Sequence, residues 1–151
     1  MFLTKNYFVF LLSLFAYSSE WIIWARKYSK IPHYFNYDLM KKLNGDKQAK
    51  DVWRLPAVGS WEKTQGKHPT QKPLGLLSRI ILSSTQKGDL ILDPFSGSGT
   101  TGIAATILGR QFIGIDKELE FLELSKRRYQ AITPKSKYEF KQKIREQISL
   151  V

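Results

Sequence analysis

The pattern of apolar and polar residues is most informative between positions 90 and 116. The run Leu90–Leu92 is apolar and stops at Asp93, which predicts a buried strand with a carboxylate at its tip. A turn of small residues follows at positions 96–101, with the sequence Ser-Gly-Ser-Gly-Thr-Thr.

A helix and a second strand are predicted after this turn. Apolar residues recur at helical spacing from Ile103 to Leu108, and Gly109 is suited to end that helix. Apolar residues at positions 112, 113 and 115 then predict a strand that ends at Asp116. The result is a strand–loop–helix–strand unit of the α/β class. In open α/β sheets ligands bind just beyond the carboxyl ends of the strands, so a site at the loop is expected.

The rest of the chain gives weaker patterns. Four elements are predicted from periodicity and composition: a strand at Glu20–Ala25, a short helix near Tyr37–Leu43, an amphipathic helix from Leu74 to about Ser84, and a helix from Leu119 to Tyr129. The apolar run Phe8–Tyr17 is too short to span a bilayer and lacks the cleavage site of a signal peptide. We expect it to be a buried strand, or a start that is not the natural beginning of a domain, and we expect no membrane partner.

Composition excludes several classes of site. The chain of 151 residues is long enough for one domain with a real core. It has no cysteine, which excludes disulfides and thiolate metal ligands, and His33 and His68 are too few and too far apart to suggest zinc. No metal is therefore expected.

The net charge of +11 favours a polyanionic partner such as double-stranded DNA. Between Arg26 and Lys72 there are eleven Lys or Arg against four Asp or Glu, whereas residues 90–116 are close to neutral. Aromatic residues are interleaved with this basic stretch: Tyr34, Phe35, Tyr37, Trp53 and Trp61. Basic and aromatic side chains together suit a nucleic-acid surface. The alternatives are a merely solvated lysine face and, for any single ring, packing within a loop-rich subdomain.

Several ligands are compatible with a glycine-rich loop. Gly97, Gly99 and Gly102 match the dinucleotide fingerprint, with Asp116 at about the right distance for a ribose hydroxyl. Four residues, 93–96, separate the strand from the first glycine, however, and the Asp93 carboxylate would repel a pyrophosphate. A phosphate-binding P-loop is disfavoured because no Gly-Lys-Ser/Thr follows.

S-adenosylmethionine, a ligand with an ammonium, a sulfonium and a carboxylate, fits the loop better. Asp93 could attract the ammonium, and the ring of Phe95 could face the sulfonium. Backbone N–H groups of residues 98–101, at the start of a helix, could hold the carboxylate, and Asp116 could accept from both ribose hydroxyls. The alternatives are a strand-end cap for Asp93 and a turn residue for Asp116.

Three blocks of this sequence resemble a known family. Residues 68–81 (HPTQKPLGLLSRII), 93–101 (DPFSGSGTT) and 109–116 (GRQFIGID) look like the cofactor-binding half of the bacterial DNA amino-methyltransferases. These are the β-ordered enzymes of restriction–modification systems, which methylate the exocyclic amine of adenine or cytosine. Residues 20–27 resemble a late strand of the family's sheet, and residues 51–63 resemble its segment before the cofactor blocks.

The resemblance implies a Rossmann-like fold and a set of cofactor-binding residues. By it, the S-adenosylmethionine site is formed by Thr70, Lys72, Asp93, Phe95, Gly97, Ser98, Gly99, Thr100, Thr101 and Asp116. It further implies a cytoplasmic enzyme that methylates DNA, with adenine the expected target. The implied domains are an unassigned apolar segment at 1–19, a partial methyltransferase domain at 20–132 and a basic tail at 133–151. Within that domain, residues 28–67 form a basic aromatic insert and residues 68–132 the cofactor-binding part.

One feature of the family is missing from the sequence. Family enzymes grip the flipped base with an Asp/Asn/Ser-Pro-Pro-aromatic segment, whereas no two of the six prolines here are adjacent. Three predicted strands are also fewer than the seven that the family implies. We therefore expect an incomplete sheet and no catalytic residue, as in the C-terminal part of an interrupted gene or one half of a split enzyme with a companion chain. The rival hypotheses are an NAD-dependent oxidoreductase and a non-catalytic basic DNA-binding module.

Overall fold

The computed structural model describes residues 19–25, 27 and 30–149. Contacts divide the chain into two units, Met1–Pro32 and His33–Val151. The described residues of the first unit contain no helix and no strand. The strand predicted at Glu20–Ala25 is therefore wrong: its side chains are suited to a sheet, but a strand needs a paired neighbour, and none pairs with it in the part described. The apolar run Phe8–Tyr17 lies outside the described residues.

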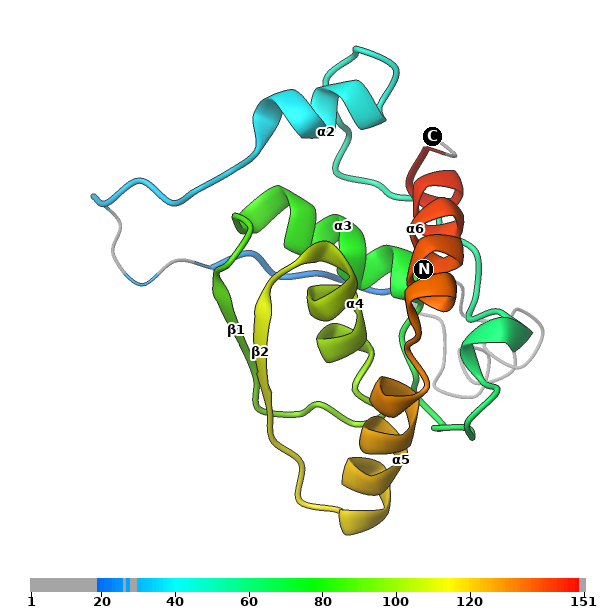
Figure 1. Cartoon of the computed structure of the whole chain (residues 1–151). Helices are drawn as coiled ribbons and strands as arrows, with labels where there is room; N and C mark the ends of the chain where they lie inside the picture. The colour runs from blue at the N-terminus through cyan, green and yellow to red at the C-terminus, as the bar shows by residue number, and fades with distance from the viewer. Residues whose placement is uncertain (1–18, 26, 28–29, 150–151) are drawn as a thin grey trace, which may run out of the picture. The chain divides into compact units, whose positions relative to one another are not determined.

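The second unit contains all of the assigned elements (Figure 1). Its helices are α2 (Tyr37–Leu43), α3 (Leu74–Ser84), α4 (Thr100–Leu108), α5 (Leu119–Gln130) and α6 (Pro134–Ser149), with a 3-10 turn η1 (Ser60–Glu62). Its strands are β1 (Leu90–Asp93) and β2 (Gln111–Gly114). These elements confirm the predicted helices near positions 37, 74, 100 and 119 and both predicted strands of the central unit.

The strands β1 and β2 form a two-stranded parallel sheet within the described residues. Leu90 pairs with Gln111 and Asp93 with Gly114, so the carboxyl ends of the two strands lie at the same edge. Helix α4 makes the crossover between them, and it ends at Gly109, whose φ of 78° is the left-handed conformation that glycine adopts at helix ends.

The core lies between helices rather than between sheet layers. Its buried residues come from α3, α4 and α6: Leu74, Ile81, Ile103, Ala104, Ala105, Ile107, Ile144 and Ile148. The segment assigned to a basic tail is thus a helix that contributes two core residues. Its sequence has too few apolar positions to show this, because Ile144 and Ile148 stand among basic and polar residues.

Helix α4 packs against one face of the sheet (Figure 1). Ile91 and Phe112 point to this face and pack against the core, whereas Leu90, Leu92 and Ile113 on the other face are exposed. No helix of the described part is both long and apolar enough to cross a membrane.

Candidate functional site

The tips of β1 and β2 are joined to each other beyond the end of the sheet. The N–H of Ile115 donates to the carbonyl of Asp93 at 2.9 Å, and the N–H of Ser96 donates to the carbonyl of Ile115 at 2.9 Å. The ladder therefore continues past Asp93 and into the loop. This places the loop between Asp93 and Asp116, as the sequence pattern predicted.

The carboxylate of Asp93 fastens the loop to the first turn of α4. One oxygen accepts from the backbone N–H of Phe95 at 3.0 Å, and the other accepts from the hydroxyl of Thr101 at 2.6 Å. Each carboxylate oxygen can accept more than one hydrogen bond, so Asp93 can still accept from a ligand donor. The Phe95 ring beside it is 86% exposed.

The carboxylate of Asp116 fastens the other side of the loop. It accepts from the N–H of Glu118 at 3.0 Å and from the N–H of Gly97 at 2.7 Å. These two bonds, that of Glu118 first, hold the pKa of Asp116 below its usual range, because they favour the charged form. Asp116 is thus an ionised acceptor beside the loop at neutral pH.

Two glycines of the loop have backbones that other residues rarely adopt. Gly97 has φ 49° and Gly99 has φ 72°, both in the left-handed region. A Cβ atom on Gly99 would lie 2.0 Å from the hydroxyl oxygen of Ser125 in α5. Glycine is therefore required for α4 to begin this close to α5.

The side chains of Ser98 and Thr100 face the protein interior. Both residues are 4% exposed. Arg128, from α5, donates to the Ser98 carbonyl at 2.5 Å and to the Thr100 hydroxyl at 3.0 Å. What these two residues can offer a ligand is therefore backbone N–H groups, since the first N–H groups of a helix have no partner within it.

Arg128 is itself buried, at 7% exposed, and burial lowers its pKa. The nearby charge of Glu62 acts in the opposite direction and favours the protonated guanidinium. Glu62 is 5% exposed and accepts from the backbone N–H of Leu74 at 2.7 Å, at the start of α3. Burial raises the pKa of Glu62 above its usual range, although this bond and the Arg128 charge oppose the shift. Glu62 thus holds the start of α3, and Arg128 joins α5 to the loop.

His68 brings the His-Pro-Thr segment next to the loop. Its Nδ1 accepts from the backbone N–H of Thr70 at 3.2 Å, and its ring lies edge-on to that of Phe121 with 4.1 Å between centroids. A Cβ atom on Gly97 would lie 3.2 Å from His68 Nε2. Thr70 thus lies near the loop through its hydrogen bond to His68, and Lys72, two residues further on, is exposed.

The structure thus brings eight of the ten predicted site residues together at one loop: Asp93, Phe95, Gly97, Ser98, Gly99, Thr100, Thr101 and Asp116. Sequence reasoning missed Arg128, His68 and Phe121. Arg128 is four residues after the buried Leu124, so it lies on the same face of α5. A charge on the buried face of a helix was the signal that could have found it.

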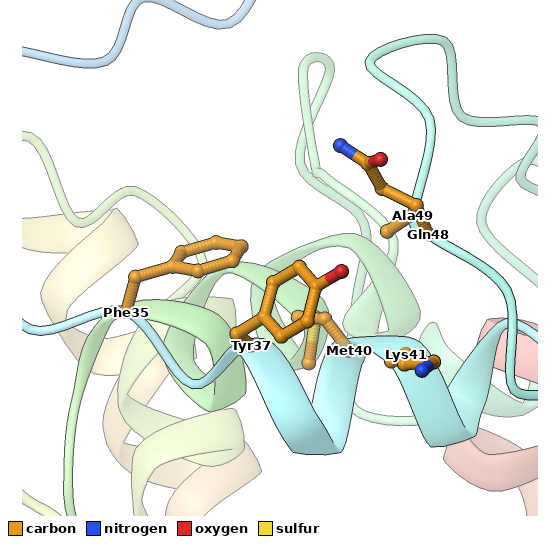
Figure 2. A pocket seen from close by; sticks show the side chains of 6 residues that line it. All are labelled: Phe35, Tyr37, Met40, Lys41, Gln48 and Ala49. Atoms are coloured by element: carbon orange, nitrogen blue, oxygen red, sulfur yellow. The ribbon is translucent and has the colours of Figure 1, made fainter.

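A separate pocket lies beside α2 (Figure 2). It has a volume of about 130 Å³ and is lined by Phe35, Tyr37, Met40, Lys41, Gln48 and Ala49. A second depression, of about 210 Å³, lies between α4 and α5 and includes Gly99 and Ser125. Neither is lined by Asp93, Phe95 or Asp116. The described parts of the chain contain no group of three or more His, Asp or Glu residues that could hold a metal ion.

Sequence and structure comparisons point to one class of proteins. A family model described as DNA methylase, of the N6/N4 type, matches residues 4–127. The chain is 85% identical over 137 residues to the type II methyltransferase M2.MboI of Moraxella bovis, covering 91% of this chain and 50% of that protein. It is 59% identical over 118 residues to M2.DpnII of Streptococcus pneumoniae, covering 78% of this chain and 44% of that protein.

A solved structure gives the same result. The crystal structure of M1.HpyAVI with SAM matches with a TM-score of 0.52 and 39% identity, over 66% of this chain and 45% of that one. The chain spans about half the length of the curated relatives it matches.

Proposed function

Because the chain belongs to the N6/N4 family of DNA methylases, we propose that it is the cofactor-binding part of a DNA amino-methyltransferase. Its α/β fold is an incomplete form of the Rossmann-like methyltransferase fold. The reaction would be methyl transfer from S-adenosylmethionine to the exocyclic amine of adenine in a specific DNA site. The single observation that carries the proposal is the pair of carboxylates, Asp93 and Asp116, on either side of one loop at the adjacent strand ends.

The residues of the loop fit this cofactor. Its ammonium would lie at Asp93, which retains acceptor capacity, and its sulfonium would face the exposed ring of Phe95. Its carboxylate would accept from the free N–H groups at the start of α4, where the helix dipole favours negative charge. Asp116, held ionised by backbone donors, would accept from the ribose hydroxyls. When bound, the cofactor supplies an electrophilic methyl group on its sulfonium.

Hydrogen bonds to the neighbouring elements would fix the conformation of this loop. Asp93 and Thr101 join the loop to α4, Arg128 joins it to α5, and Asp116 joins it to β2. We assign Thr70 and Lys72 to the methionine end of the cofactor. His68 and Phe121, which lie beside Gly97, would border the same site.

Methyl transfer would require groups that this sequence does not supply. A base flipped from the duplex must be gripped by a polar and aromatic segment, and the six prolines of this chain include no adjacent pair to form one. We infer that the residues of this chain bind the cofactor, and that methyl transfer requires such a segment in addition, for example from a companion polypeptide. Its DNA substrate and its cofactor would place the enzyme in the cytoplasm.

The dinucleotide-dependent oxidoreductase is not favoured, because the relatives that match are methyltransferases. The Gly97-x-Gly99-x-x-Gly102 spacing, on which that hypothesis rests, has a structural cause. Gly99 allows close approach to Ser125, and a Cβ atom on Gly102 would lie 2.5 Å from the Phe112 ring. Packing thus accounts for two of the three glycines without a pyrophosphate.

Equilibrium dialysis with radiolabelled S-adenosylmethionine tests the proposal. Wild-type protein is expected to bind, and Gly97→Asp to weaken binding by about tenfold or more, because the new side chain crowds His68 and adds a second negative charge at the residue whose N–H binds Asp116. Gly45→Asp is the matched control, since Gly45 also has a left-handed backbone but lies in the turn after α2 with no atom near its Cβ position. Its affinity should equal that of wild type.

Three results would count against the proposal. If neither wild type nor Gly97→Asp bound S-adenosylmethionine, the proposed cofactor site would be wrong. Displacement of the labelled cofactor by NAD but not by S-adenosylhomocysteine would favour the hypothesis of an NAD-dependent oxidoreductase. Salt-dependent DNA binding with no response to the cofactor would favour a DNA-binding module.

A further inference from the structure

The aromatic residues of the basic stretch fall into two groups in the structure. Trp61 packs against α6, and Trp53 lies over the guanidinium of Arg79 in α3, 4.6 Å from the ring centroid. These two rings are therefore used in contacts within the protein. Phe35 and Tyr37 instead line the pocket beside α2, where they are 42% and 50% exposed. The rings at the pocket are the ones that a ligand can reach.

The pocket combines flat apolar surfaces with a few polar groups. Figure 2 shows the rings of Phe35 and Tyr37 at the start of α2, with Gln48 on a separate segment across from them. The buried side chain of Met40 adds apolar surface, and Lys41 adds a cation. The Gln48 amide supplies both hydrogen-bond donors and an acceptor. A volume of about 130 Å³ is smaller than the ~300–1,000 Å³ of pockets for drug-sized ligands, so it suits a single flat ring system.

Contacts with neighbouring residues hold the walls of this pocket in place. The N–H of Asn36 donates to a carbonyl at the end of α3 at 2.8 Å, which attaches the start of α2. The side-chain amide of Asn44 donates to the carbonyl of Gln48 at 2.8 Å and fixes the turn after α2. Trp53 then attaches the following segment to α3. The described lining residues all lie between positions 35 and 49, so one continuous, fixed segment forms the pocket and a ligand need not order it.

The charge around the pocket favours a ligand that carries phosphate. Residues 41–54 include five Lys or Arg and two Asp, and all five basic residues are exposed. Such a surface attracts a polyanion. A flat ring linked to a phosphate would use both features, with the ring on the aromatic side chains and the phosphate near a basic one. This is the chemistry of a nucleotide.

We propose that the pocket beside α2 binds one unstacked base of the DNA substrate. The inference rests on the proposed function, which supplies DNA as the substrate. The base stacks on the ring of Tyr37, with the Gln48 amide at its edge and Lys41 beside the adjacent phosphate. Because a paired base is held in the duplex stack, the pocket selects DNA in which a base has left the helix.

The pocket is separate from the cofactor loop, since neither Asp93 nor Asp116 lines it. A free nucleotide has the same chemistry as one unit of a DNA strand. Of the five basic residues at 41–54, Lys41 is the one that lines the pocket. The other four are placed for phosphates further along a strand, which favours DNA over a free nucleotide.

Duplexes with one extrahelical residue test the proposal. Fluorescence anisotropy compares a duplex that carries a single bulged adenine with the same duplex carrying an abasic residue at that position. The wild-type chain should bind the bulged base about tenfold more tightly, as expected for a base stacked on an aromatic side chain. Tyr37→Ala should remove this preference. Lys41→Gln should weaken the binding of both duplexes equally and lower the salt slope by about one, because the phosphate is present in both.

Tyr34→Ala is the matched control. Tyr34 is 40% exposed and close in sequence to Tyr37, but it does not line the pocket. This variant should keep the preference for the bulged base. All three variants should bind S-adenosylmethionine as wild type does, since none of these residues belongs to the cofactor loop, and this shows that the chain is folded.

The outcomes separate this inference from the proposed function. Equal binding of both duplexes by wild type, or a preference that survives in Tyr37→Ala, would overturn the base pocket. Competition by free dAMP as effective as by the bulged duplex would overturn it in favour of a site for a free nucleotide. Binding of S-adenosylmethionine would still support the proposed function in these cases. A preference that depends on Tyr37, in a chain that does not bind S-adenosylmethionine, would support the pocket and contradict the proposed function.

Discussion

Gly99 is the residue whose identity the structure constrains most tightly. Its left-handed backbone and its contact with Ser125 both exclude a side chain. In Gly99→Ala we expect the free energy of unfolding to fall by about 2–5 kcal/mol, of which about 1–2 kcal/mol is backbone strain and the rest steric overlap. Chemical denaturation measures the change.

Gly45→Ala is the control for this prediction. Gly45 has a similar φ of 62°, but no atom lies within 4 Å of its Cβ position, so only the loss of about 1–2 kcal/mol from backbone strain should appear. Equal losses in the two variants would show that the Ser125 contact does not restrict the loop.

Arg128 is predicted to act as a positioning residue for the loop. Arg128→Met should lower the free energy of unfolding by about 1–3 kcal/mol, because the Ser98 carbonyl and Thr100 hydroxyl lose a charged donor. The affinity for S-adenosylmethionine should fall by about tenfold as the loop loosens. Arg127→Met, at the exposed neighbouring position, should change stability by less than about 0.5 kcal/mol. An unchanged affinity in Arg128→Met would contradict the role.

Asp116 gives the stability a pH dependence of known sign. Its pKa is lower in the folded state than in the unfolded state, so the unfolded chain takes up the proton first as pH falls. The stabilisation by Asp116 is present above about pH 4, its ordinary range, and is lost as pH falls through the folded pKa. Denaturation of Asp116→Asn between about pH 5 and about pH 2 should show a smaller loss of stability with acid than wild type.

The exposed carboxylate of Glu123, in α5, provides the control for this measurement. Glu123→Gln removes one carboxylate charge without removing an acceptor of the loop's N–H groups, so it controls for the loss of charge alone. If Asp116→Asn gave a profile parallel to wild type, the N–H bonds of Glu118 and Gly97 would not stabilise the carboxylate.

Some features of single residues can be predicted from the sequence, and others cannot. Asp93 and Asp116 were predictable because each ends an apolar run. The inward orientation of Ser98 and Thr100 was not, because it depends on Arg128, which is 30 and 28 residues away along the chain. A short polar side chain in a loop has no periodicity that distinguishes a buried position from an exposed one.

Among the elements, helices with a regular apolar stripe were predicted correctly. The helices α2, α3 and α5 begin and end within a residue of their predicted bounds. The strand predicted at Glu20–Ala25 failed because a strand depends on a neighbour that local sequence does not specify. The contribution of helix α6 to the core was not predicted because, among its described side chains, only Ile144 and Ile148 are buried.

Helix α6 should therefore contribute to stability despite its polar composition. In Ile148→Ala we expect the free energy of unfolding to fall by about 2–4 kcal/mol, because the side chain is 1% exposed and its removal leaves a cavity. Thermal or chemical denaturation measures this loss. Tyr138→Ala, at a 65% exposed position of the same helix, should change stability by less than about 0.5 kcal/mol. Equal effects would show that the helix does not dock in the core.

At the scale of the whole molecule, the sequence and the structure both indicate an incomplete methyltransferase domain. The absence of adjacent prolines predicted it, and the exposed side chains on one face of the β1–β2 sheet and the coverage of about half of each relative are consistent with it. What the sequence did not reveal is that the described core lies mainly between α3, α4 and α6. This core supports the loop at residues 93–101 even though, in the described part of the chain, only two strands of the sheet are paired.

A crystal of the chain soaked in S-adenosylmethionine would test the central claim most directly. The account predicts density for the cofactor over the loop, with its ammonium at Asp93, its sulfonium beside Phe95 and its ribose at Asp116. An empty loop, or density confined to the pocket beside α2 (Figure 2), would contradict it.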